Sequence, residues 1–177
     1  MHYTFPTIFR AVYDKAVNKY GTGARSAAEL FSPKEVEWLA ANGITAQAMF
    51  DYAEDHHNGG EPGYDNALAI EAIRRDYFVN VQHGKPSKIV LDEAAMPGKD
   101  AEAKGIRWLP RVIPKTKAKL RGELPASLMY SCGGDRRFFK THDILPAEFL
   151  SLVWRNLDND AAIIDWVVQR SHAQANA

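Results

Sequence analysis

The chain has 177 residues, with 22 basic and 22 acidic side chains and an apolar fraction of 46%, which is the composition of an ordinary globular protein. Its single cysteine excludes an internal disulfide and a cysteine-based zinc site, so packing alone must stabilise the fold. The N-terminal residues lack the basic and apolar regions of a signal peptide, and no apolar run reaches the roughly 18 residues that a membrane span needs. We therefore expect a cytoplasmic protein with no membrane segment.

Residues 1–82 are predicted to form a helical N-terminal lobe. Apolar side chains recur at steps of three and four before glycine stops, which is typical of amphipathic helices. Ser32 and Glu35 have the spacing of a capping box, and Asp65 or Asn66 is the expected cap of the last helix in this lobe. The expected helices cover about residues 7–20, 33–42, 45–57 and 65–77.

Residues 83–105 are expected to be a linker, because glycine and proline punctuate short segments there. Within it, residues 89–91 form a strand-like apolar run. The next segment, residues 106–172, is predicted to be a C-terminal lobe, and residues 173–177 a frayed tail.

The C-terminal lobe begins with an expected helix over residues 108–121, which Pro114 should kink or confine to the residues after it. A short strand is possible over residues 128–132, and Asp135 is the expected cap of a short helix that follows. Two more helices are expected near residues 146–154 and 160–169. The predicted fold is therefore mainly α, with two small helical lobes and at most one or two short β-strands.

Several segments of residues 106–170 follow the order of a known pattern. Residues 109–118 are similar to an L-x-R-x-I-D-K-x-R-A helix, residues 130–135 to a Y-x-C-P-x-D segment and residues 160–167 to a D-x-x-I-x-x-W stretch. In this order they resemble a family of small bacterial proteins known only as a domain of unknown function. Pro114 replaces an acidic residue of that pattern, and Gly133 replaces a proline. The resemblance implies a bacterial cytoplasmic protein and a boundary near residue 105, but no activity.

Charge is distributed unevenly along the neutral chain. The segment from Lys104 to Lys140 carries ten basic and two acidic side chains, whereas the segment from Asp51 to Asp76 carries seven acidic and two basic ones. We interpret the basic segment as a site for a small anionic metabolite that bears phosphate or carboxylate. The expected charge contacts are Arg111, Lys115 and Arg136. Tyr130, Cys132 and Asp135 are expected to line the site.

The basic segment has other interpretations. It could face solvent or pack against the acidic lobe, or it could be an interaction module that docks on an acidic protein or on nucleic acid. No nucleic-acid reader motif accompanies the charge, so nucleic acid is the least favoured partner. The sequence names no cofactor and gives no oligomeric state.

An enzyme is the main alternative to a binding protein, with Cys132 or a metal as its reactive group. Cys132 lies just before a predicted helix start, where backbone amides stabilise a thiolate, and Asp135 would assist it. His142 is the nearest histidine in sequence that could serve as a base. Glu54 and His57 stand three residues apart on a predicted helix, so they could supply two ligands to a metal ion. Against these, a free cysteine is more often a small buried apolar residue, and acidic helix ends are more often solvated.

Overall fold

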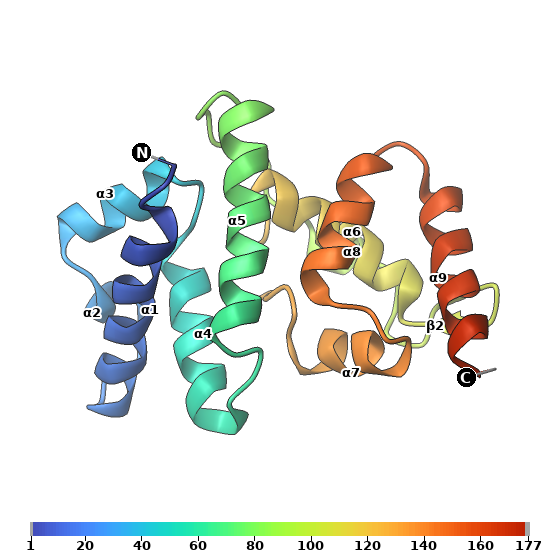
Figure 1. Ribbon diagram of the computed structural model, residues 1–177, viewed down its shortest axis with the longest axis horizontal. Coiled ribbons are helices and arrows are strands. Elements are labelled where there is room, and N and C mark those ends of the chain that lie inside the picture. Colours follow the sequence, from blue (N-terminus) through green and yellow to red (C-terminus); the bar gives the residue numbers. More distant parts are fainter. Residues whose placement is uncertain (1, 176–177) are drawn as a thin grey trace. The chain divides into compact units, whose positions relative to one another are not determined.

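A computed structural model describes residues 2–175 of the chain. Contacts divide the chain into two compact units, residues 1–86 and residues 87–177. The fold is mainly helical, with a two-stranded antiparallel sheet in the described part, which confirms the predicted fold class (Figure 1). None of the helices described is both long enough and apolar enough to cross a membrane.

The first unit is built from helices only. They are α1 (Phe5–Gly21), α2 (Ala27–Leu30), α3 (Pro33–Ala41), α4 (Ala46–Gly59) and α5 (Tyr64–Asn80). At the start of α3, the backbone N–H and the hydroxyl of Ser32 both donate to Oε2 of Glu35, at 2.8 and 2.7 Å, so the predicted capping residues are in contact. The cap of α5 is Gly63, not Asp65 or Asn66, which both lie inside the helix.

The core of the first unit lies where α1 packs against α4. Helix α1 has an apolar stripe because its large side chains recur every three or four residues, and that stripe is buried. Its buried members include Phe9, Val12, Tyr13 and Ala16, and those of α4 are Met49, Tyr52 and Ala53. This packing fixes the end of α4 beside the middle of α1.

The second unit combines a hairpin with four helices. Its elements are the 3-10 turn η1 (Glu93–Ala95), the strands β1 (Glu102–Ala103) and β2 (Ile106–Arg107), and the helices α6 (Leu109–Arg121), α7 (Gly133–Thr141), α8 (Pro146–Arg155) and α9 (Asp160–Ala175). Helix α6 packs against α8 and against the hairpin, and the rings of Phe138, Phe139 and Phe149 meet at centroid distances of 5.5–6.1 Å. Helix α6 starts five residues before Pro114, so its regular part is not confined to the residues after this proline.

Both predicted strand positions were wrong. Residues 89–91 are not paired with any strand of the described chain, and Ile89 and Val90 are 65% and 66% exposed. Residues 128–132 form no strand: Tyr130 and Ser131 lie in a turn, and Ser131 takes a left-handed conformation at φ 65° that interrupts an extended run. A short apolar run forms a strand only when a neighbouring strand is present to pair with it, and in the described chain neither run has such a neighbour.

The strands that do form were not predicted. β1 and β2 pair with Glu102 opposite Arg107 and Ala103 opposite Ile106. Lys104 and Gly105 connect them, both at positive φ (50° and 78°), as a two-residue hairpin turn requires. Residues 176 and 177, the end of the predicted frayed tail, lie outside the described residues.

Candidate functional site

Asp135 is a buried acceptor in the second unit rather than a helix cap. The cap of α7 is Cys132, and Asp135 is the third residue of the helix. Its Oδ2 accepts from Nζ of Lys115 at 2.7 Å and from the backbone N–H of Ser131 at 2.9 Å, and its Oδ1 accepts from Nε1 of Trp108 at 3.0 Å. Because all three donors belong to the protein, this carboxylate is occupied in structure rather than exposed as an acid or base.

Lys115 brings a positive charge to this buried carboxylate. It projects from α6, and its side chain is 2% exposed, against 0% for Asp135. Its Nζ also lies 3.1 Å from Sγ of Cys132. Removing a charge from water costs several kcal/mol per ion, and the attraction between the two charges only roughly offsets this cost. A buried ion pair of this kind therefore needs further hydrogen bonds to its remaining donors and acceptors. The pair therefore joins α6 to the start of α7 at one fixed geometry.

Trp108 is held by the same carboxylate in a strained conformation. Its φ is 72°, in the left-handed region, which costs a bulky residue about 1–3 kcal/mol. The indole N–H donates to Asp135, and the ring packs against Gly134, where an added Cβ would be 2.5 Å from Cζ2. Non-glycine strain of this type is concentrated at functional sites, where the surroundings hold it in place.

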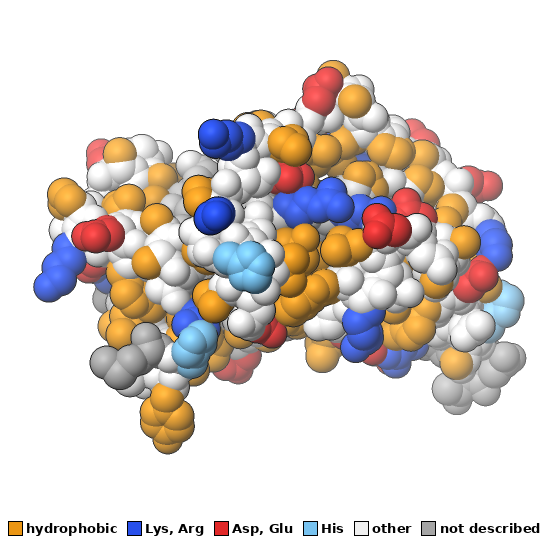
Figure 2. Space-filling model, turned by 90° about the horizontal axis from the view of Figure 1, so that it is seen from above, with side chains coloured by type: hydrophobic (Ala, Val, Ile, Leu, Met, Phe, Trp, Pro, Cys, Tyr) orange, Lys and Arg blue, Asp and Glu red, His pale blue; other side chains and the backbone are white. Residues whose placement is uncertain are grey.

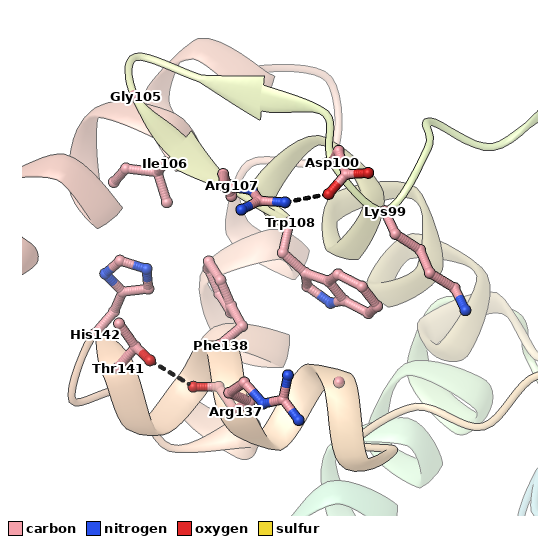
Figure 3. A pocket seen from close by; sticks show the side chains of 11 residues that line it. Lys99, Asp100, Gly105, Ile106, Arg107, Trp108, Arg137, Phe138, Thr141 and His142 are labelled. Carbon is pink, nitrogen blue, oxygen red and sulfur yellow. Dashed lines mark hydrogen bonds and ion pairs between the residues drawn. The ribbon is translucent and has the colours of Figure 1, made fainter.

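A cavity of about 500 Å³ lies beside Trp108, between the hairpin and α7 (Figure 3). Figure 3 shows Ile106 and Arg107 reaching it from β2, Arg137 and Phe138 from α7, and His142 from the position just after α7. The lining residues are Lys99, Asp100, Gly105, Ile106, Arg107, Trp108, Gly134, Arg137, Phe138, Thr141 and His142.

The cavity carries unpaired positive charge. Arg107 forms an ion pair with Asp100, but within the described part of the chain neither Lys99 nor Arg137 has an acidic partner. His142 adds an imidazole whose Nδ1 lies 2.8 Å from Oγ of Ser171, and burial lowers its pKa below the usual value. The ring is therefore mainly neutral at pH 7, and the net charge of the lining comes from the two unpaired cations.

The start of α7 adds backbone donors at the same place. The first bond of the helix runs from the N–H of Arg136 to the carbonyl of Cys132, and no side chain caps the N-terminus. The amides of Gly133 and Gly134 precede that bond, and Gly134 lines the cavity. Such amides, at the positive end of the helix dipole, favour an anion.

The residues predicted to bind the anion are placed differently. Arg111 donates to the carbonyl of Pro97 at 2.9 Å and lies 3.4 Å from Glu93, and Arg136 donates to the carbonyl of Ser131 at 2.6 Å. Tyr130 is buried, and its hydroxyl donates to the carbonyl of Pro146 at 2.8 Å. Burial raises the pKa of Tyr130 far above its usual range, with the nearby Asp135 charge as a second cause.

None of the six predicted ligand residues lines the cavity, although three of them form one cluster. The cluster is Lys115, Cys132 and Asp135. Sequence reasoning missed Lys99 and Arg137 as lining residues. The available signal was Trp108, which stands beside Arg107 in the basic segment and has no place in an apolar helix stripe.

Much of the basic segment is neutralised within the second unit. At least five of its cations form ion pairs there: Lys104 with Asp165, Arg107 with Asp100, Arg111 with Glu93, Lys115 with Asp135, and Lys117 with Asp160. Figure 2 likewise shows basic and acidic side chains interspersed over the face in view. The positive net charge of this sequence segment is therefore not matched by an equally basic surface.

Glu54 and His57, the predicted metal ligands, lie on α4 with protein partners. Glu54 accepts from the hydroxyl of Tyr20 at 3.2 Å, and Nε2 of His57 lies 2.9 Å from the carbonyl of Val17. The His57 ring also stacks on Tyr20, at a centroid distance of 5.3 Å. Across residues 2–175, no three His, Cys, Asp or Glu side chains are grouped so that they could hold a metal ion.

The hairpin, helices α6 to α9 and the whole cavity fall inside one segment of the chain. Residues 98–177 match a domain of unknown function (DUF5069). This confirms the predicted resemblance of a segment to a domain-of-unknown-function family. No curated protein and no solved structure matches the chain. The DUF5069 match brings no activity with it, so the function has to be argued from the cavity.

Proposed function

We propose that the DUF5069 segment binds a small anionic ligand, a phosphate or carboxylate, in the cavity between the hairpin and α7. The observation that carries this proposal is that two cations without an acidic partner, Lys99 and Arg137, line a cavity whose wall includes the strained Trp108. The uncapped start of α7 adds amide donors beside them. Together these groups supply charge and directed hydrogen bonds to one anionic group.

The shape of the cavity supports a ligand that has an apolar part as well. Its volume falls within the range of about 300–1,000 Å³ that small-molecule sites occupy. In Figure 3, Lys99 lies on the right of the view and Arg137 near its lower middle, whereas Ile106 and His142 lie on the left. A ring or short aliphatic group attached to the anion would contact Ile106 and Phe138.

The test is a titration of the full chain with phenyl phosphate, monitored through the ¹⁵N-labelled indole NMR signals of the tryptophans. Binding should move the Trp108 signal, which Trp108→Phe identifies, and inorganic phosphate should bind more weakly because it lacks the ring. Arg137→Ala and Lys99→Ala should each weaken binding about tenfold or more, since a hydrogen bond to a charged group is worth about 1.5–3 kcal/mol.

Arg155→Ala is the matched control, because Arg155 is an exposed basic residue on α8 that does not line the cavity. Equal phenyl phosphate affinity in all three variants would count against the proposal. So would an affinity that depends only on the salt concentration and is equal to that for a DNA oligonucleotide.

A variant of Cys132 distinguishes ligand binding in the cavity from thiol chemistry. It does not line the cavity, and serine is a good residue at a helix cap. Cys132→Ser should therefore leave the phenyl phosphate affinity unchanged. A large loss of affinity in this variant would move the site from the cavity to the thiol.

A further inference from the structure

Lys115 and Cys132 place an amine beside a thiol in the second unit. Nζ of Lys115 lies 3.1 Å from Sγ of Cys132, across seventeen residues of sequence. Both groups are held in place, because Lys115 is buried on α6 and Cys132 is the cap residue of α7. The separation falls within the about 3–3.5 Å at which two positioned atoms are ready to react. The fold therefore prepares a bond between these two atoms.

Oxidation is the chemistry that makes the sulfur open to attack by an amine. Cys132 is partly exposed, so a small oxidant has access to it. Hydrogen peroxide converts such a cysteine to a sulfenic acid, which then condenses with a thiol to a disulfide or with a nitrogen to a sulfenamide. The chain has a single cysteine, which excludes an internal disulfide. The amine of Lys115 stands where the nitrogen of a sulfenamide is needed.

Asp135 is placed to accept the proton that this condensation releases. An ammonium has no free electron pair, so Lys115 must lose a proton before its nitrogen attacks sulfur. Oδ2 of Asp135 accepts from Nζ of Lys115 at 2.7 Å, and both side chains are buried. Proton transfer along this hydrogen bond turns two buried charges into two neutral groups. The interior is then left without an unpaired charge when the ammonium disappears.

We propose that a peroxide joins Cys132 and Lys115 through a reversible sulfenamide bond. The peroxide oxidises the thiol to a sulfenic acid and is itself reduced to water. The amine of Lys115, after passing one proton to Asp135, attacks Sγ. The N–S bond forms, the S–O bond breaks, and the hydroxide leaves as water with a second proton from the nitrogen. Two molecules of an external thiol restore the amine and the thiol, and they are oxidised to a disulfide.

The bond also affects Trp108, through Asp135. Oδ1 of this carboxylate accepts from the indole N–H at 3.0 Å. A hydrogen bond to a charged acceptor is about twice as strong as one to a neutral acceptor, so protonation of Asp135 weakens the contact. Trp108 lines the cavity between the hairpin and α7, so oxidation changes the support of that wall. Formation of the bond itself requires no ligand in the cavity.

The experiment treats the folded full chain with hydrogen peroxide and analyses its unreduced tryptic peptides by mass spectrometry. Trypsin does not cut after a modified lysine, so residues 112–117 should appear joined to residues 122–136. The joined peptides should weigh about 2 Da less than their sum, because the N–S bond replaces two hydrogens. Dithiothreitol should separate them. An unmodified Cys132, or one oxidised without joined peptides, would overturn the proposal. So would a loss of two hydrogens within residues 122–136 alone, which would place the bond on a backbone nitrogen.

Lys115→Arg removes the amine but keeps a positive charge beside Asp135, because a guanidinium remains protonated and is a poor nucleophile. This variant should give Cys132 oxidised to a sulfenic or sulfinic acid, without joined peptides. Lys117→Arg is the matched control on the same helix, since Lys117 pairs with Asp160, and it should join as wild type does. Joined peptides from Lys115→Arg, or none from Lys117→Arg, would contradict the assignment.

Unfolded wild-type chain gives a test that does not depend on the folding of a variant. In concentrated urea the amine and the thiol lose their fixed separation, so peroxide should oxidise Cys132 without joining it to Lys115. Equal yields of joined peptides from folded and unfolded chain would show that the fold does not direct the reaction. The ¹⁵N indole NMR signal of Trp108 should move in the joined protein and return with dithiothreitol. An unmoved signal would rule out Asp135 as the proton acceptor.

Discussion

Nζ of Lys115 lies 2.7 Å from Oδ2 of Asp135, and the two side chains are 2% and 0% exposed. The partners are twenty residues apart, one on α6 and one in the first turn of α7. Through Oδ1, the same carboxylate holds the indole of Trp108 against the cavity. A buried ion pair that served only stability could be exchanged for apolar residues, whereas this one also fixes the wall of the proposed binding site.

Asp135→Ala should destabilise the protein by about 3–5 kcal/mol, because it leaves the Lys115 ammonium buried without a countercharge. Guanidinium denaturation gives the free energy of unfolding. Asp165→Ala is the control, since it breaks an exposed ion pair with Lys104, and it should cost no more than about 1 kcal/mol. Similar losses in the two variants would show that the buried pair has no special role.

Gly134→Ala should destabilise the protein even though alanine is the better helix former. An added Cβ would lie 2.5 Å from Cζ2 and 2.7 Å from Cη2 of Trp108, so the indole must move. Gly133→Ala, one residue earlier, is the matched control: the nearest atom to its Cβ is on Arg136, 3.9 Å away. That variant should gain up to about 1 kcal/mol from helix propensity. Denaturation and the ¹⁵N indole signal of Trp108 together check both, and a stabilised Gly134→Ala protein with an unmoved indole would contradict the packing.

The helices were predictable because their signals are local. Steps of three and four between apolar residues, with Ser32 and Glu35 at capping distance, define α1 and α3 from a few neighbouring positions. The strands were not predictable in the same way, since a strand exists only with a partner. Residues 128–132 have strand-like composition but no partner, whereas the hairpin formed at residues 102–107 without an alternating apolar pattern.

The candidate site depended on contacts between distant residues. The charge of residues 104–140 directed attention to the second unit, but composition does not show which cations have acidic partners. Lys115, Arg111 and Arg137 each count as one positive charge in the sequence. In the structure, Lys115 is buried against Asp135, Arg111 lies beside Glu93, and Arg137 lines the cavity. Only the fold separates these three cases.

The stability of the first unit should depend on pH through Glu35. Hydrogen bonds from Lys15 and then from Ser32 lower the pKa of Glu35 to about 2, against 4.5 for the free side chain. Because the folded state holds the ionised form more strongly, this contribution is present above pH 4.5 and is lost as the pH falls toward 2. Glu35→Gln should cost up to about 1 kcal/mol at pH 7, through loss of the Lys15 ion pair. Thermal melts from pH 7 to pH 2 should bring the two proteins together at the acid end, and a constant gap would contradict the assignment.

The stability of the second unit should fall as His142 becomes protonated. Burial lowers the pKa of His142 below its usual 6.5, so the folded state favours the neutral ring that contacts Phe138 and Ser171. The unfolded chain then binds a proton before the folded chain does. The contribution of His142 is therefore complete above pH 6.5 and is lost as the pH falls toward the lowered pKa.

His142→Gln should flatten this slope, because glutamine can still donate to Ser171 but does not titrate. The measurement is the free energy of unfolding between pH 7.5 and 5.5 in wild type and variant. His83→Asn is the control, since His83 is exposed in a left-handed conformation that asparagine tolerates, and its removal should leave the slope as in wild type. A slope that persists in His142→Gln but disappears in His83→Asn would show that the titrating group is His83 and not His142. Phenyl phosphate should oppose the loss in wild type, because an anion in the cavity favours the protonated ring that lines it.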